Sequence, residues 1–185
     1  MFKKVMIFIL FYVTQNHTAL RFICISPAES AHSIKRNYNP TRRTYRECFL
    51  TENGKNALEL TCLQLVNRGI NRENIAMTYT SPLTPTIQTA ALLAKNGIVD
   101  PDKLNIDDRL IDIDQSYGEN QNSVRYRVAQ LIDEVKETHQ EGNVIFISHT
   151  IPTQLMLRLI CRNDKSVQNK ELTLSAAGFG IVDIE

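Results

Sequence analysis

Three short segments of the chain combine residue types that could hold an anionic ligand. They read Ser26-Pro27-Ala28-Glu29, Ser81-Pro82-Leu83-Thr84-Pro85 and Ser148-His149-Thr150, and each follows an apolar run. The second and third lead directly into sequences with helical periodicity. The N-terminus of a helix favours negative charge, and hydroxyl and imidazole groups supply further hydrogen-bond donors. These segments therefore predict a site for a phosphate-like ligand.

The sequence around these segments alternates between strand and helix patterns. Apolar runs predict buried strands over 21–25, 75–80, 143–148 and 178–184. Helical spacing and stop signals predict helices over about 51–69, 82–97, 123–137 and 152–160. Such alternation predicts an α/β three-layer sandwich, in which a mostly parallel central sheet carries helices on both faces. Ligands bind such sheets beyond the carboxyl ends of the strands, where all three segments are expected to lie.

The composition excludes some classes of protein. The 185 residues are 43% hydrophobic and 22% charged, with a net charge of +1, which is typical of one globular domain. The chain lacks the overall positive charge that would favour a nucleic-acid binder. The four cysteines contain no C-x-x-C pair, which argues against a zinc site and leaves any disulfide pairing open; they are Cys24, Cys48, Cys62 and Cys161.

Residues 1–19 form a region of their own. A basic head, an apolar run over 5–13 and a polar tail that ends at Ala19 are typical of a secretory signal peptide, although His17 is larger than the residue usual at that position. The run is too short to span a bilayer, which needs about 20 apolar residues. The alternatives are an apolar first strand or a buried N-terminal helix. With a cleaved signal, residues 20–185 form an exported domain, periplasmic or secreted; without one, the protein is cytoplasmic.

The segments also carry a family resemblance. From about residue 21 to the end, the chain resembles the histidine phosphatase (phosphoglycerate mutase-like) superfamily. The family's Arg-His-Gly-Glu-Ser motif corresponds to Ser26-Pro27-Ala28-Glu29-Ser30, and its Leu-Thr-x-x-Gly helix start to residues 50–54. The motif Ser-Pro-Leu-x-Arg, continued by Gln-Thr-Ala, corresponds to residues 81–90, and Val-Ser-His-Gly to residues 147–150. Four motifs in order on the expected elements make the resemblance specific.

The resemblance implies a site without most of its chemical groups. In the family, a histidine attacks phosphorus while two arginines and a second histidine hold the phosphoryl oxygens. The position of the attacking histidine is Pro27 here, and the two arginine positions are Ser26 and Pro85. His149 matches the second histidine. Proline has no nucleophilic side-chain atom.

Two carboxylates are further candidates that the resemblance implies. Asp112 fits the position of the family's acid/base residue, with a shorter side chain, and Glu29 is retained from the first motif. Simpler interpretations exist for both. The alternating acids of residues 106–114 also fit a solvated face, and Glu29 also fits a hydrogen bond that fixes its loop.

A basic stretch could replace the lost arginines. Between Glu29 and Glu47 the chain has five cations and no acid. The ligand-binding candidates from this stretch and from the motifs are His149, Ser26, Thr84, Arg36, Arg42 and Arg43. A solvated basic loop is the simpler interpretation of the stretch.

The sequence therefore predicts a catalytically inactive pseudophosphatase that binds a phosphate-bearing small molecule or a protein partner. The alternative is an active phosphomonoester phosphatase with His32 or His149 as its nucleophile. We expect no cofactor, no metal, no nucleic-acid partner and no stable membrane span.

Overall fold

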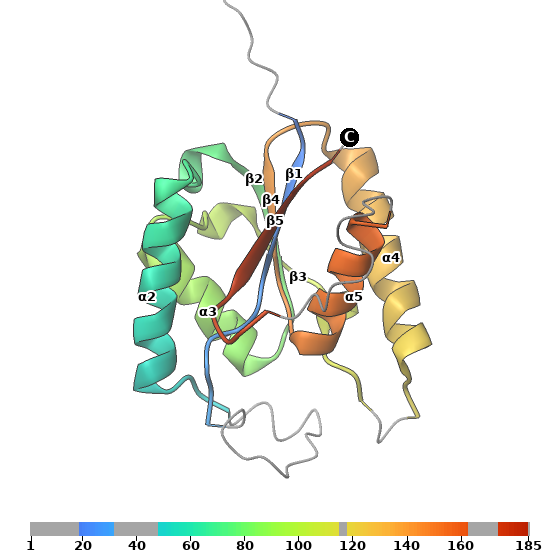
Figure 1. The fold of residues 1–185 in the computed structure, drawn as a ribbon, viewed down its shortest axis with the longest axis horizontal. Coiled ribbons are helices and arrows are strands. Elements are labelled where there is room, and N and C mark those ends of the chain that lie inside the picture. Colours follow the sequence, from blue (N-terminus) through green and yellow to red (C-terminus); the bar gives the residue numbers. More distant parts are fainter. Residues whose placement is uncertain (1–18, 32–47, 115–117, 163–173, 185) are drawn as a thin grey trace, which may run out of the picture.

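The computed structural model describes residues 19–31, 48–114, 118–162 and 174–184. Within them, a five-stranded sheet lies between two layers of helices (Figure 1). The strands lie in the order β3-β2-β4-β1-β5. Their bounds are Arg21–Ile25 for β1, Ile75–Thr80 for β2, Leu104–Ile106 for β3, Asn143–Ile147 for β4 and Phe179–Asp183 for β5. All neighbours are parallel except β1 and β5, so the mostly parallel α/β sandwich expected from the sequence is confirmed.

The register of the sheet brings the three predicted segments to one edge. Ile147 of β4 pairs with Ile25 of β1 on one side and with Thr80 of β2 on the other. A serine directly follows each of these three strands: Ser26 after β1, Ser81 after β2 and Ser148 after β4. The register therefore places the three serines at the same level of the sheet. Two backbone bonds extend the pairing by one step, from Ser148 N to Ile25 O (3.2 Å) and from Ser81 N to Ile147 O (3.1 Å).

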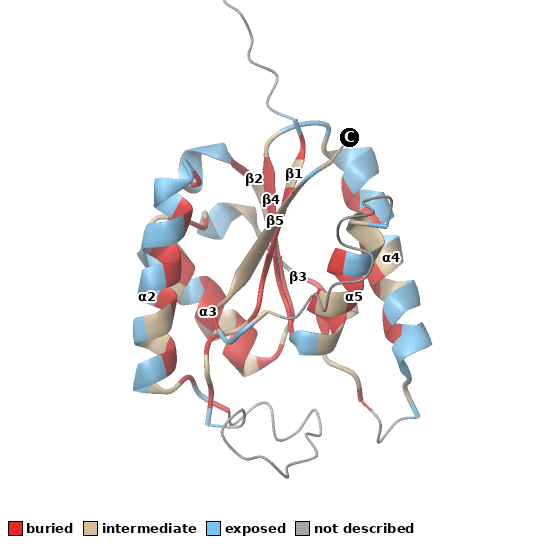
Figure 2. Cartoon of the chain, in the orientation of Figure 1, coloured by how far each residue is buried: buried red, intermediate tan, exposed pale blue. Residues whose placement is uncertain are grey.

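Each face of the sheet has its own hydrophobic core. Helices α2 (Glu52–Asn67) and α3 (Thr84–Lys95) cover one face, and α4 (Gln121–Thr138) and α5 (Thr150–Ile160) cover the other (Figure 1). Alternate residues of β1 and β4 point into the two cores, which is the period of an extended strand. Figure 2 shows buried residues along the sheet and on the inner sides of the helices, with exposed residues outside.

The helix limits follow signals present in the sequence. Thr51 is the N-cap of α2, and its hydroxyl accepts from Gly54 N at 3.0 Å. Gly69 and Gly97, with φ of 75° and 74°, follow α2 and α3 in the left-handed region that glycine adopts readily. Two starts differ from expectation. Helix α3 begins after Leu83, because Ser81 still pairs with β4, and α5 begins before Pro152, which lies in its first turn.

Strand β3 and its continuation correct the interpretation of residues 106–114 as a solvated face. The short strand was not predicted, because three residues carry too little periodicity. Ile106, the last residue of β3, is 57% exposed, whereas Asp107 and Asp114, which follow the strand, are buried. Asp107 accepts hydrogen bonds from Arg109 (2.7 Å to Nη2), and a buried carboxylate needs such a partner.

One side of α2 is unusually apolar. Leu58 and Leu65 pack in the core, as helical spacing predicts. Leu60, Leu63 and Val66 lie on the exposed side of the same helix. The apolar residues of α2 therefore extend beyond the side of the helix that packs against the sheet.

The remaining sequence expectations meet the structure only in part. No disulfide joins the four cysteines, all of which lie in the described residues, so the pairing that the sequence left open does not occur. Burial raises the pKa of the Cys24 thiol to about 12 and, to a smaller degree, that of Cys62 to about 11. In the described part of the chain, no helix is long and apolar enough to cross a membrane. The predicted signal segment lies outside the described residues up to Thr18.

Candidate functional site

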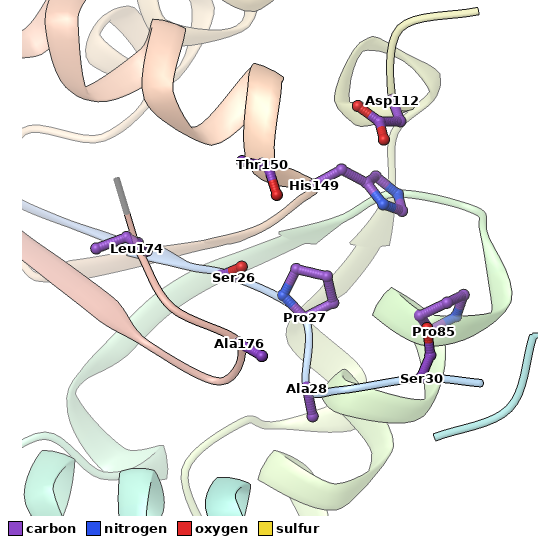
Figure 3. Close-up of a pocket in the computed structure, with 10 residues that line it drawn as sticks. All are labelled: Ser26, Pro27, Ala28, Ser30, Pro85, Asp112, His149, Thr150, Leu174 and Ala176. Atoms are coloured by element: carbon purple, nitrogen blue, oxygen red, sulfur yellow. The ribbon is translucent and has the colours of Figure 1, made fainter. Parts of the chain in front are cut away.

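A cavity of about 240 Å³ opens at the carboxyl edge of the sheet (Figure 3). It has the size of a small ligand and lies below the range of about 300–1,000 Å³ usual for drug-sized molecules. Its walls come from the ends of β1 and β4, the starts of α3 and α5, the segment after β3 and the segment before β5. The described residues that line it are Ser26, Pro27, Ala28, Ser30, Pro85, Asp112, His149, Thr150, Leu174 and Ala176.

His149 is held rigidly in this cavity. It is the N-cap of α5, and its backbone carbonyl accepts from Thr153 N at 2.9 Å. The side chain is only 3% exposed, and its Nε2 lies 3.0 Å from Ser81 Oγ. The imidazole therefore connects the end of β4 with the end of β2.

The loop after β1 is fixed from two sides. Ser26 N donates to Gly178 O at 2.9 Å, and Pro27 O accepts from Ala177 N at 3.1 Å. From the other side, Ala28 N donates to Thr89 Oγ1 of α3 at 3.1 Å. Pro27 thus stands at the end of the central parallel strands with its ring in the cavity wall (Figure 3). Its ring offers neither a nucleophile nor a donor to a ligand.

The turn before β5 is strained at one residue. Ala177 has a φ of 58°, in the left-handed region that costs a non-glycine residue about 1–2 kcal/mol. Two hydrogen bonds hold it there: its N–H donates to Pro27 O, and its carbonyl accepts from Thr61 Oγ1 at 2.6 Å. Strain that the surroundings maintain beside a cavity is typical of functional loops.

Pro85 forms the wall on the side of α3. It occupies the first turn of that helix, where the missing N–H of proline costs nothing, and it is buried. Thr86 supports this turn, since its hydroxyl lies 2.8 Å from Ser81 O and 2.7 Å from Leu83 O. No lysine or arginine lines the cavity among the described residues.

Asp112 supplies the only carboxylate among the described lining residues. The segment that carries it is anchored to the sheet, because Ser148 Oγ donates to Leu110 O at 2.7 Å. Arg127 of α4 donates to the backbone carbonyls of Arg109 and Asp112 and pairs with Glu119 at 2.9 Å. These bonds hold the Asp112 backbone at the cavity mouth.

Asp107 and Arg109 complete this support. Burial alone would raise the pKa of the Asp107 carboxyl, but hydrogen bonds and charge from Arg109 outweigh it and lower the pKa overall. The guanidinium also pairs with Glu134 at 2.6 Å, and both carboxylates raise the pKa of Arg109.

Glu29 does not line the cavity, although the sequence made it a candidate. Its Oε1 accepts from the Thr51 hydroxyl at 2.7 Å, and its carbonyl accepts from Thr51 N at 2.9 Å. The first turn of α2 packs so closely here that a Cβ on Gly54 would lie 2.2 Å from Glu29 O. The Leu-Thr-x-x-Gly pattern is thus a packing requirement that fixes the Glu29 loop.

The other predicted site residues divide into two groups. Ser26, Pro27, Pro85, Asp112 and His149 come together around one cavity, whereas Thr84 lies in α3 outside its lining. The candidates Arg36, Arg42 and Arg43, and the alternative nucleophile His32, lie outside the described residues.

Sequence reasoning missed the cavity residues that belong to no polar motif. Leu174 and Ala176 reach it because β5 is antiparallel, so that the chain before it lies at the edge where the parallel strands end. The only signal in the sequence was the start of a strand near Gly178. In the described part of the chain, no group of three or more His, Cys, Asp or Glu side chains is placed to hold a metal ion.

Comparisons with known proteins agree with this geometry. Residues 99–185 match the family model described as "Histidine phosphatase superfamily (branch 1)". The fold is also similar to solved structures, all at low sequence identity. The protein histidine phosphatase SixA complexed with tungstate has a TM-score of 0.63 and 14% identity, with 89% of this chain and 88% of that chain covered.

Two further structures are similar along most of their length. A protein of Mycobacterium tuberculosis, the product of the open reading frame Rv3214, has a TM-score of 0.66 and 19% identity, with 92% of this chain and 93% of that chain covered. A mutant phosphoserine phosphatase of Entamoeba histolytica in complex with phosphoserine has a TM-score of 0.66 and 14% identity, with 88% and 89% covered. Among curated proteins, no sequence relative is found.

The fold is therefore that of a phosphoglycerate mutase-like α/β protein with its cavity at the carboxyl edge of the sheet. Within it, residues 99–185 match the histidine phosphatase superfamily model.

Proposed function

We propose that this protein does not turn over phosphomonoesters and acts as a binding protein of the histidine phosphatase superfamily. The observation that carries the proposal is the presence of Pro27 at the end of β1, in the wall of the cavity that also holds His149. Covalent phosphoryl transfer needs a nucleophile at this point, and a proline ring provides none.

The missing cations support the same conclusion. A transferring phosphoryl group develops charge on its oxygens, and arginine stabilises that charge because its planar fork donates two hydrogen bonds at once. At the two positions where the family has arginines, Ser26 and Pro85 line this cavity. The charge that Asp112 adds there is negative.

Binding remains compatible with the geometry. The cavity is bordered by the N-termini of α3 and α5, which favour anions, and hydroxyls of Ser26 and Thr150 line it beside His149. A mutant phosphoserine phosphatase of the same fold has been solved with phosphoserine bound, so the fold can hold a phosphorylated ligand when altered. We propose a phosphate-bearing small molecule or protein partner as the ligand, with Arg36, Arg42 and Arg43 as the additional cations.

A hydrolysis assay tests the proposal. Purified residues 20–185 and the His149→Ala variant are compared for release of phosphate from p-nitrophenyl phosphate and phosphoserine. We expect no difference between the two proteins, and rates far below the range of about 1–10³ s⁻¹ usual for enzymes.

The alternative, an active phosphatase with a replacement nucleophile, predicts a different result. Turnover in the enzymatic range that disappears on His149→Ala or on His32→Ala would contradict the proposal and identify the nucleophile. Folding of each variant is checked by circular dichroism, because His149 is buried.

A further inference from the structure

Strand β5 forms one edge of the sheet, and within the part of the chain that the structure describes no strand pairs with its outer side. In Figure 1 it lies in front of the other strands, between α2 and α5. It is partly exposed along its length, whereas β1 and β4 are almost entirely buried. Proteins commonly protect such an edge with lysine, proline or a bulge, because unpaired backbone groups accept another strand. Residues 179–183 contain neither lysine nor proline, and their register with β1 has no bulge, so this edge is open to pairing.

The hydrogen bonds between β5 and β1 show which backbone groups face outward. Ser26 N donates to Gly178 O at 2.9 Å, and Ile184 N donates to Leu20 O at 2.8 Å. In an antiparallel pair, residues that bond to the partner strand alternate with residues whose N–H and C=O point the other way. The even-numbered residues of β5 therefore bond to β1. The outward N–H and C=O groups belong to Phe179, Ile181 and Asp183.

These three outward residues are spaced symmetrically about Ile181. A second copy of the chain, related by a two-fold axis at Ile181, would place its own Ile181 opposite this one and its Asp183 opposite Phe179. In that antiparallel register, each outward N–H of one copy meets an outward C=O of the other. The edge is therefore complementary to itself.

The same register brings opposite charges together. The Arg68 guanidinium lies over the Phe179 ring, 5.1 Å from its centre. Residues directly opposite each other in antiparallel strands point to the same face of the sheet, so the partner's Asp183 would lie beside Phe179 and within reach of Arg68. Asp183 pairs with Arg21 of its own copy at 2.8 Å, and a carboxylate has acceptor positions for a second guanidinium as well. The two-fold axis creates this contact twice.

Helix α2 supplies apolar area that a strand alone lacks. A stable dimer buries about 800 Å² on each partner, more than one strand of five residues provides. Thr61 and Arg68 of α2 contact the turn before β5 and its first residue, so this helix lies along the edge. Leu60 and Leu63, on the outer side of α2, are 62% and 61% exposed. The two-fold axis places the two α2 helices next to each other on one face of the joined sheet, where these leucines would be covered.

We propose that this protein forms a two-fold symmetric dimer in which β5 pairs with β5 of a second copy about Ile181. Arg68 of each copy pairs with Asp183 of the other, and the two α2 helices lie side by side. The interface shares no residue with the described lining of the cavity around His149. It therefore stands or falls independently of the proposed function.

Sedimentation velocity of the full chain over a series of concentrations tests the dimer, and two charge reversals test its register. In Arg68→Glu, both contacts between the copies join two acids, and in Asp183→Lys both join two bases. Each variant alone is expected to raise the Kd of the dimer by about tenfold or more, because like charges that lie opposite each other repel. In an equimolar mixture of the two variants, both contacts again join opposite charges. The mixed dimer is therefore expected to regain the wild-type Kd to within about threefold.

The matched controls are Lys136→Glu and Asp133→Lys, which make the same changes of charge at exposed positions of α4, on the other face of the sheet. Both are expected to dimerise as the wild type does. Arg68 and Asp183 are exposed too, so the charge reversals leave the fold intact, which a thermal melt verifies. Amide hydrogen exchange at Ile181 gives a second measurement. It is expected to slow as the concentration of the wild type rises, because dimerisation gives this N–H a hydrogen-bond acceptor.

Several results would overturn the inference. A wild-type chain that stays monomeric at every concentration excludes a second copy as the partner of this edge. A dimer that both charge reversals leave intact forms through another surface. Charge reversals that weaken the dimer without recovery in the mixture exclude the register about Ile181. An equal loss in the α4 controls shows a response to overall charge only.

Discussion

Two cavities of similar size differ in the hydrogen-bonded frame around them and in the charged residues that line them. The cavity at the sheet edge has an extensive frame: aligned strand ends, buried hydrogen bonds to Thr89 and Ser81, and a glycine fitted against Glu29. Among the described residues, no lysine or arginine lines it. The cavity between α4 and α5, of about 260 Å³, has Arg125, Arg158 and Arg162 on exposed positions and little frame. Shape and chemistry are thus separate features, and a retained fold does not imply a retained reaction.

The largest effect is expected from Gly54→Ala, which attacks the frame of the first cavity. The added Cβ would lie 2.2 Å from Glu29 O, and a backbone atom cannot move aside as a flexible side chain can. We expect the free energy of unfolding to fall by about 3 kcal/mol. Urea unfolding measures it. A variant as stable as the wild type would show that the contact with Glu29 is not tight.

A smaller loss is expected from Arg109→Ala, which removes the support of the Asp112 segment. The substitution breaks hydrogen bonds to Asp107 and Glu134, and we expect a loss of about 2 kcal/mol at neutral pH.

The pH dependence of that loss follows from Asp107. Its pKa is lower in the folded protein than in the unfolded chain, so the pair stabilises the fold above the ordinary carboxyl pKa of 3.8. That stability disappears as the pH falls through the folded pKa. The difference between wild type and Arg109→Ala is therefore largest near neutral pH and shrinks below pH ~4. An equal difference at pH 7 and pH 3, by urea unfolding, would contradict the role of Asp107.

Ser81→Ala tests the hold on His149. The substitution removes the partner of His149 Nε2 inside the protein, and leaves a buried ring nitrogen without that bond. We expect a loss of about 1 kcal/mol. Ser123→Ala, on the exposed surface of α4, is the control and is expected to change stability by less than about 0.5 kcal/mol. Equal effects of the two substitutions would mean that the contact contributes nothing.

The smallest effect on stability is expected at the second cavity. Arg125→Gln with Arg158→Gln removes two exposed charges that form no ion pair with the described residues, so we expect a change within about 0.5 kcal/mol. A thermal melt in the absence of phosphate decides. A large loss of stability would show that these arginines belong to the frame of the fold.

Much of the fold was predictable because its signals are local. Strand β1 was predicted with the bounds that it has, and Thr51 and Gly69 marked the limits of α2. Strand β3 was not predictable, because its three residues are held by pairing with β2. The burial of Asp107 was not predicted either. The alternating acids of this segment favoured a solvated face, and their pattern does not show that Arg109 pairs with Asp107.

The candidate site was predictable only where motifs mark strand ends. The sequence predicted that His149, Pro27 and Pro85 lie together, because parallel strands end at the same edge of a sheet. The register of β1, β2 and β4 places them there. Leu174 and Ala176 were not, because their approach depends on the antiparallel return of β5. The cavity between α4 and α5 was missed because its residues are spread over two helices, and no spacing within either helix identifies the partner.

The central claim is that the cavity at the sheet edge keeps its shape and lacks only its chemical groups. The triple variant Ser26→Arg, Pro27→His and Pro85→Arg restores the family's residues beside His149. Isothermal titration with vanadate compares it with the wild type. We expect the triple variant to bind at least about tenfold more tightly, and single variants to gain little because the groups act together. Equal, negligible affinity in a folded triple variant would contradict the claim and show that the cavity no longer has the geometry to hold a phosphoryl group.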